Sequence, residues 1–155
     1  MLSVLAVTDE SGAIIRPELL AAALPVHRQL RPMLPEDSAT YAQTMARVFA
    51  GGARMWVAVD SGGAVLGVAL WRIYENTYQG LRLYLDDLVT DAACRSQGVG
   101  KCLLDACAAE ARARDCRFFA LDSGTWRTQA HKLYLREGFE ISSFHFTRAL
   151  PPLRG

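Results

Sequence analysis

The stretch from Leu83 to Leu104 restricts the possible folds of this chain more than any other part of it. Its first half is rich in apolar, β-branched and aromatic residues, which favour a strand, and its second half has the composition of a helix. The two halves are joined by Arg95 to Gly100, which read R-x-x-G-x-G. We therefore expect a strand that passes through a glycine turn into a helix, as in α/β folds.

The glycine turn has the properties of an anion site. Gly98 and Gly100 lack a Cβ, so they tolerate unusual backbone angles and the close approach of a ligand. The helix that follows has unpaired N–H groups and a positive dipole end, which favour a phosphate or diphosphate, and Lys101 adds a positive charge. The spacing matches neither the P-loop nor G-x-G-x-x-G. Because such turns are also common structural junctions, the pattern alone leaves both interpretations open.

Composition narrows the class of protein. The chain has 155 residues, of which 51% are hydrophobic and 21% charged, as expected of one soluble globular domain spanning residues 1–155. A net charge of +1 argues against nucleic acid or an anionic membrane as a partner, and no apolar run reaches the length of a membrane span. The four cysteines lack C-x-x-C spacing, which suits reduced thiols and predicts a cytoplasmic location.

Hydrophobic periodicity predicts a single mixed domain of strands and helices. We expect strands at residues 2–7, 55–59, 64–74, 81–90, 116–122 and 139–150, and helices at 17–30, 37–50, 98–114 and 126–136. Pro25 is expected to interrupt or kink the first helix. The strand at 116–122 should pair in parallel with residues 85–89 through a right-handed crossover.

Two neighbouring carboxylates, Asp86 and Asp87, lie in the strand that precedes the turn. Adjacent residues of a strand point to opposite faces, so one of them should face inward unless a bulge shifts the register. Because a buried carboxylate is costly without partners, this placement favours a functional site, with a solvated strand end as the alternative. His27, on the first helix, is expected at the surface or half-buried rather than as a ligand.

Two stretches resemble the GNAT superfamily of acyl-CoA-dependent N-acyltransferases. Leu88 to Asp91 followed by R-x-x-G-x-G is similar to the family's diphosphate-binding motif, and residues 130–139 match its A-x-x-L-Y-x-x-x-G-F signature. The order of the expected elements also matches. The resemblance implies an α/β (α+β) single-domain fold. Its mixed, mostly antiparallel sheet would have a splayed parallel pair in the middle and about four flanking helices.

The resemblance implies acetyl-CoA, or another short acyl-CoA, as co-substrate, with no metal. The main chain of one strand segment would bind the pantetheine arm, and the glycine turn would bind the diphosphate. The implied residues are Leu88, Val89, Thr90, Arg95, Ser96, Gln97, Gly98, Val99, Gly100, Lys101 and Cys102. Arg127 stands where the family often has Asn, so it could reach a CoA phosphate or be solvated.

The resemblance also implies roles in transfer of the acetyl group to a primary amine. Tyr134 matches the family's tyrosine general acid. Asp86 is our first choice of base and Asp87 the second, with His131 and His145 less favoured. The residues around Asp86 resemble the acid pair of diamine acetyltransferases, which favours a small cationic amine. Glu75, Tyr78 and Trp126 are candidates for binding that amine.

Two further expectations rest on analogy with the superfamily. A homodimer is expected from the superfamily alone. The alternative function is a non-catalytic domain that binds or senses acyl-CoA, and a third reading is an interaction protein whose glycine turn is only structural.

Overall fold

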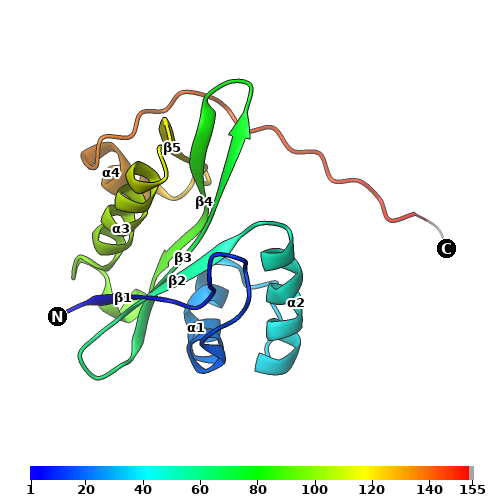
Figure 1. Cartoon of the computed structure of the whole chain (residues 1–155), viewed down its shortest axis with the longest axis vertical. Helices are drawn as coiled ribbons and strands as arrows, with labels where there is room; N and C mark the ends of the chain where they lie inside the picture. The colour runs from blue at the N-terminus through cyan, green and yellow to red at the C-terminus, as the bar shows by residue number, and fades with distance from the viewer. Residues whose placement is uncertain (154–155) are drawn as a thin grey trace. The chain divides into compact units, whose positions relative to one another are not determined.

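The computed structural model, drawn in Figure 1, describes residues 1–153. It divides into two compact units, Met1–Leu121 and the segment that starts at Asp122. The first unit contains five strands, three α-helices and a short 3-10 helix, and the second contains one helix, α4 (Thr128–Arg136). Among the described residues no helix is both long and apolar enough to cross a bilayer. That residues 1–155 act as one domain stays a prediction.

The first unit is built on a mixed sheet with the strand order β1-β2-β3-β4-β5. The strands are β1 (Ser3–Ala6), β2 (Arg54–Val59), β3 (Val65–Asn76), β4 (Gly80–Thr90) and β5 (Phe118–Leu121). The first three pairings are antiparallel and the β4–β5 pairing is parallel, which confirms the expected sheet class. The parallel pair lies at the edge of the sheet, whereas we expected it in the middle.

The parallel pairing is shifted from the expected register. Residues 82–85 of β4 pair with residues 118–121 of β5, so the pairing ends at Leu85, where we expected it to begin. Beyond Leu85 the strand β4 continues to Thr90 and pairs only with β3. The two parallel strands therefore separate after Leu85, and residues 86–90 of β4 have one edge without a strand partner in the described chain.

The expected strand at residues 139–150 is wrong. Residues 139–153 contain neither helix nor strand, and Phe144 and Phe146 are 84% and 89% exposed. Alternating apolar residues fit a pleated surface, but a strand also needs a second strand to pair with its N–H and C=O groups. The alternation of apolar and polar residues in this segment does not show whether a partner strand is present.

The helices match expectation closely because their signals are local. Helix α1 (Pro17–Leu30) has the expected bounds, and it continues through Pro25. Helix α2 (Ser38–Ala50) begins after Asp37, whose side chain caps it by accepting a hydrogen bond from the Thr40 N–H. Helix α3 (Val99–Ala113) begins one residue later than expected and α4 two residues later.

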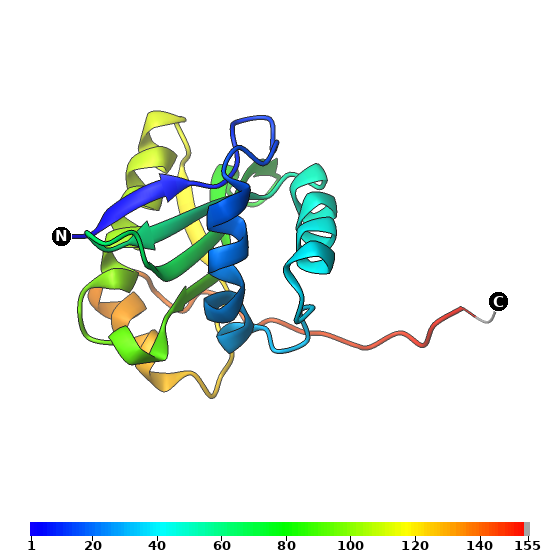
Figure 2. The same cartoon turned by 90° about the horizontal axis from the view of Figure 1, so that it is seen from below.

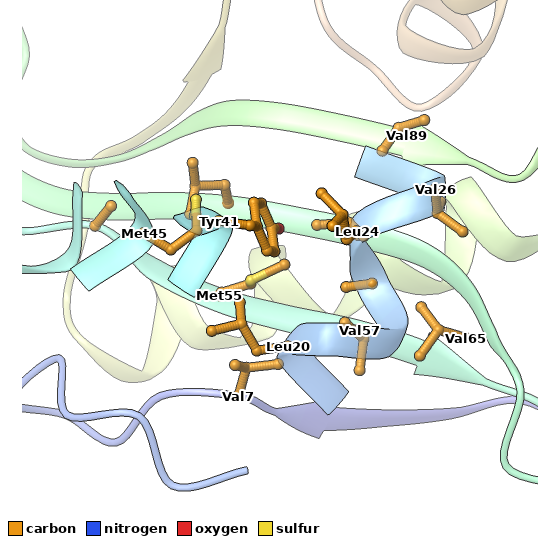
Figure 3. Close-up of a cluster of buried hydrophobic side chains, with 14 of the residues drawn as sticks. Val7, Leu20, Leu24, Val26, Tyr41, Met45, Met55, Val57, Val65 and Val89 are labelled. Atoms are coloured by element: carbon orange, nitrogen blue, oxygen red, sulfur yellow. The ribbon is translucent and has the colours of Figure 1, made fainter. Parts of the chain in front are cut away.

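Helices α1 and α2 cover one face of the sheet and enclose the main hydrophobic core (Figures 2 and 3). Helix α1 contributes Leu20, Leu24 and Val26, which are almost fully buried. The apolar residues of the other elements in this core include Val7, Tyr41, Met45, Phe49, Met55, Val57, Val65, Val68, Leu70 and Val89. This core fixes α1 over β3 and β4, which determines what lies beside the two aspartates.

Helix α3 packs on the other face of the sheet, and Gly67 of β3 permits its close approach. A Cβ at Gly67 would lie 2.6 Å from Val99 Cγ1 and 3.0 Å from Leu103 Cδ1. Both of those side chains are buried, so they have little room to move away. The start of α3 is thereby held against β3, next to the end of β4.

Gly67→Ala is expected to lower the free energy of unfolding by about 1–3 kcal/mol, the usual cost of overpacking a well-packed core. Chemical denaturation measures this loss. Gly62→Ala is the matched control, because a Cβ at Gly62 meets only a carboxylate oxygen of Asp60 at 3.4 Å. Equal stability of the two variants would contradict the close packing of α3 on β3.

Candidate active site

The N-terminus of α3 is open because no side chain caps it. Gly98 occupies the N-cap position with φ 81°, and Ser96 also has a left-handed φ of 67°. A Cβ at Gly98 would meet nothing within 4 Å, so the glycine is required by backbone conformation rather than by space. The amides of the first turn precede the helical hydrogen-bond ladder, whose first bond joins the Cys102 N–H to Gly98 O at 2.9 Å.

The loop before α3 presents polar and charged groups to solvent. Arg95, Ser96, Gln97 and Gly98 are exposed, whereas Val99 is buried in the α3 packing. The Lys101 ammonium forms an ion pair of 2.8 Å with Asp105, so its charge is shared within the helix. An exposed loop leading into an uncapped helix end is suited to bind an anion such as a diphosphate.

The free edge of β4 lies next to this helix end in the chain. Leu88, Val89 and Thr90 pair on one side with Ala69, Val68 and Gly67 of β3. On the other side no strand of the described chain pairs with them, because β5 ends its pairing at Leu85. Backbone N–H and C=O groups on a free strand edge can pair with an extended ligand, as an added strand would.

A β-bulge brings both aspartates to the face covered by α1 and α2. Asp87 pairs with Leu70, but Leu85 pairs with Trp71, so Asp86 is the additional residue between them. Asp87 shares its face with Leu70, which belongs to the core under α1 and α2. Asp86 contacts Arg72 of β3, whose guanidinium also reaches the end of α2 at Gly51 O. The two aspartates therefore do not point to opposite faces of the sheet, because the bulge shifts the register between them.

Asp86 is half-buried and ion-paired. Its Oδ2 accepts a hydrogen bond of 2.8 Å from Arg72 Nε and also lies 2.8 Å from Arg72 Nη2. Burial raises the pKa of the Asp86 carboxyl above its usual value, although the hydrogen bond and the charge of Arg72 act in the opposite direction. Asp86 is therefore a stronger base than an exposed aspartate.

Asp87 is buried, and both of its carboxylate oxygens have partners. Oδ2 lies 2.7 Å from His27 Nε2, and Oδ1 accepts from Arg31 Nη2 at 2.6 Å and from Arg31 Nε at 2.9 Å. Burial alone would raise the pKa of Asp87, but the hydrogen bonds from His27 and Arg31 outweigh it and lower the pKa. Asp87 is therefore a fixed, ionised group.

These ion pairs change the charge argument for the acceptor. We expected carboxylates that line the acceptor cleft to favour a cationic amine. Each carboxylate is instead compensated by one arginine, Asp86 by Arg72 and Asp87 by Arg31. The cluster carries no surplus negative charge.

His27 is buried, with 1% exposure, so the expectation of a surface or half-buried residue is wrong. Its Nδ1 lies 2.7 Å from the hydroxyl of Tyr41. The pKa of that hydroxyl is raised well above its usual range by burial and by the charge of Asp87. A signal was present in the sequence. His27 follows Leu20 and Leu24 at helical spacing, which places it on the apolar stripe of α1.

The two residues expected at the rim of the acceptor site lie far along the sheet from Asp86. Glu75 lies inside β3, paired with Leu81, and the loop that contains Tyr78 joins β3 to β4. Leu81 precedes Asp86 by five residues in β4, which corresponds to roughly 16 Å. The structure does not bring Glu75 and Tyr78 to the aspartates.

In the second unit, Tyr134 lies on α4, half-buried and 5.9 Å, centroid to centroid, from the ring of Phe139. Burial raises the pKa of the Tyr134 phenol, and the charge of Arg127 partly opposes this. Arg127 stands at the N-cap of α4 and provides no side-chain cap. Trp126 is 80% exposed.

The two histidines of the second unit have local partners. His131 Nε2 lies 2.8 Å from Gly124 O, and His145 Nδ1 lies 3.2 Å from an oxygen of Asp122. Neither contact tests the less favoured choice of these histidines as the base, which stays a prediction.

Comparison with known proteins identifies the family. The model of the acetyltransferase (GNAT) family matches residues 19–139. The uncharacterized N-acetyltransferase YhdJ of Bacillus subtilis is 35% identical over 131 residues, covering 83% of this chain and 89% of that protein. The aminoalkylphosphonate N-acetyltransferase of Salmonella typhimurium is 38% identical over 66 residues, 43% of each chain.

Solved structures show the same fold. An aminoglycoside N-acetyltransferase in complex with CoA superposes with a TM-score of 0.76 at 20% identity, covering 96% of this chain and 95% of that one. The family match spans most of the chain, including both motifs. This chain belongs to the GNAT acetyltransferase family, and it is an N-acetyltransferase.

Proposed function

We propose that this enzyme transfers an acetyl group from acetyl-CoA to the primary amine of a small molecule. The observation that carries the proposal is the uncapped N-terminus of α3 directly after a β4 edge that has no strand partner beyond Leu85. The Salmonella relative, named for aminoalkylphosphonates, supports a small-molecule amine as acceptor rather than a polypeptide.

The proposed cofactor would be held by two stretches of main chain. The amides from Gln97 to Cys102 would hold the diphosphate, with Arg95 and Lys101 close by in sequence. The main chain of Leu88 to Thr90 would pair with the pantetheine arm, and one of its N–H groups would polarise the thioester carbonyl. When bound, acetyl-CoA supplies an activated acetyl group, and the protein supplies orientation and proton transfer.

Asp86 is the better candidate for the base. A protonated alkyl amine has a pKa of about 10.4 and must lose a proton before it attacks. Asp86 has a raised pKa, and its Oδ1 has no hydrogen bond to the described part of the chain, so it can take that proton directly or through water. Asp87 has both oxygens occupied and a lowered pKa, so it is suited to positioning.

Tyr134 is the proposed general acid for the leaving thiolate. Its match to the family signature supports this role. A tyrosine phenol is protonated at neutral pH, as a proton donor must be. Arg127, which acts on the same phenol by its charge, would limit the rise in the phenol's pKa that burial causes.

A thiol-release assay tests the proposed function. Purified protein is incubated with acetyl-CoA and a panel of small amines, and free CoA is detected with a thiol reagent. We expect CoA release that depends on the amine, together with a rise in melting temperature on addition of acetyl-CoA alone, since a ligand that binds only the native state stabilises it. A protein that neither releases CoA nor is stabilised by acetyl-CoA would exclude the proposal.

Asp86→Asn is expected to lower kcat/KM by about 10²-fold, the lower end for loss of a general base, because a water could replace part of the function. Wild-type kcat/KM should fall as the pH drops through the raised pKa of Asp86, since only the carboxylate accepts a proton. This acid limb should be absent in the variant. A pH profile of equal shape in both proteins would remove Asp86 from the base role.

A further inference from the structure

A chain of hydrogen bonds runs from the core of the first unit to a half-exposed guanidinium. The Tyr41 hydroxyl lies 2.7 Å from His27 Nδ1, and His27 Nε2 lies 2.7 Å from Asp87 Oδ2. Asp87 Oδ1 then accepts from Arg31 Nη2 at 2.6 Å. Tyr41 and His27 are fully buried and the Asp87 side chain is 9% exposed, whereas the Arg31 side chain is 44% exposed.

These hydrogen bonds fix the Nε and Nη2 edge of the Arg31 guanidinium and leave the Nη1 donors available. Nε and Nη2 both donate to Asp87 Oδ1, and Nη2 also approaches the Asp86 carbonyl oxygen at 3.4 Å. Nη1 donates to no acceptor within residues 1–153. A guanidinium has five N–H donors in a rigid fork that matches a carboxylate or another oxyanion.

Arg31 lies beside the proposed base. It follows the last residue of α1, and it contacts both the Asp86 main chain and the Asp87 side chain. Helix α3, whose N-terminus is the proposed diphosphate site, packs on the other face of the sheet, against Gly67. Arg31 therefore lies on the same sheet face as the two aspartates, and the helix of the proposed diphosphate site lies on the opposite face.

We propose that Arg31 determines acceptor specificity by binding an anionic group of the acceptor, so that the substrate is a small molecule with both a primary amine and a carboxylate or similar oxyanion. The inference rests on the proposed function. Asp86 Oδ1 receives the ammonium proton while Nη1 of Arg31 binds the oxyanion. The cluster suits such a dipolar molecule, because its aspartates are already neutralised by Arg31 and Arg72.

The test compares acceptors that differ only in the anionic group. Glycine and β-alanine are assayed against glycinamide and β-alaninamide, with wild-type protein, Arg31→Gln, Arg31→Lys and Arg28→Gln. Arg28→Gln is the matched control, since Arg28 lies on the same helix and bonds to Leu34 O and Pro32 O, away from the aspartates. Arg31→Lys keeps the charge beside Asp87 but removes the fork, so it separates recognition from folding.

Wild-type protein and Arg28→Gln should use at least one of the acids in preference to its amide. Both Arg31 variants should raise KM for that acid by about 10- to 100-fold more than they raise KM for its amide, as expected for loss of a hydrogen bond between charged groups. Calorimetric titration of both acids into protein saturated with CoA gives the same comparison without turnover.

The proposal for Arg31 would be overturned if neither acid were preferred over its amide, or if the Arg31 variants weakened acid and amide equally. Those results leave the proposed function standing as long as other amines release CoA. Failure of acetyl-CoA to bind any of the four proteins would instead overturn the proposed function, so the two failures are distinguishable.

Discussion

Tyr134→Phe is expected to lower kcat by about 10³-fold, within the range measured for loss of a general acid. The substitution removes only the hydroxyl and keeps the ring, which packs against Phe139. The leaving thiolate would then lack its proton donor, while binding of acetyl-CoA should not change. Steady-state kinetics with a saturating amine, together with the melting-temperature shift caused by acetyl-CoA, measures both quantities.

Leu135→Met is a suitable control for this variant, because Leu135 is the next residue of α4 and is 53% exposed. It should retain nearly full turnover and stability, since the exchange conserves volume. If Tyr134→Phe kept the wild-type kcat under conditions in which chemistry limits the rate, the acid assignment would have to be abandoned.

Asp87→Ala is expected to lower the free energy of unfolding by about 3–5 kcal/mol, the usual cost of removing one partner of a buried ion pair. His27 would lose the acceptor of its Nε2, and Arg31 would lose the one carboxylate that it contacts within residues 1–153. Asp86→Ala is the control. Asp86 is more exposed, and Arg72 is its one ion-pair partner in the described part of the chain, so a loss of about 1 kcal/mol is expected. Urea denaturation of both variants measures the difference, and equal losses would contradict the special role of the His27–Asp87–Arg31 cluster.

The stabilisation by Asp87 should also depend on pH. The pKa of Asp87 is lowered in the folded state, so the unfolded state binds the proton more strongly. The contribution is therefore complete above the unfolded pKa of about 3.9 and is lost as the pH falls from there toward the folded pKa. The stability difference between wild-type protein and Asp87→Ala should shrink below about pH 4. A difference that stayed constant down to about pH 3 would show that the pKa of Asp87 is not lowered in the folded state.

The helices and the strand–turn–helix arrangement around Gly98 could be predicted because their signals are local. The pattern around Gly98 predicts a strand, a turn and a helix, and the structure has β4, the left-handed Gly98 and α3 in that order. Helix α1 was predicted with its observed bounds from spacing alone, since an apolar stripe needs no knowledge of its partner. The parallel pairing of β4 and β5 followed from the crossover rule.

The polar cluster could not be predicted because its members come from distant parts of the chain. His27 and Asp87 are 60 residues apart in sequence, and their contact depends on the bulge at Asp86. Helical spacing gave a hint that His27 faces inward, but not that Tyr41 and Asp87 would satisfy both ring nitrogens. The prediction of a strand at residues 139–150 was wrong for a related reason, because strand formation depends on a partner strand.

The most direct test of the account is a titration of acetyl-CoA into nitrogen-labelled protein, followed by the backbone amide resonances. We expect the largest shifts of the amide resonances at residues 97–102, in the loop and first turn of α3, and at residues 88–90 of β4. The shifts at 97–102 should also appear with CoA alone, because the diphosphate causes them. If saturating acetyl-CoA left these amides unchanged while others moved, the diphosphate would be bound elsewhere and the proposed site would be wrong.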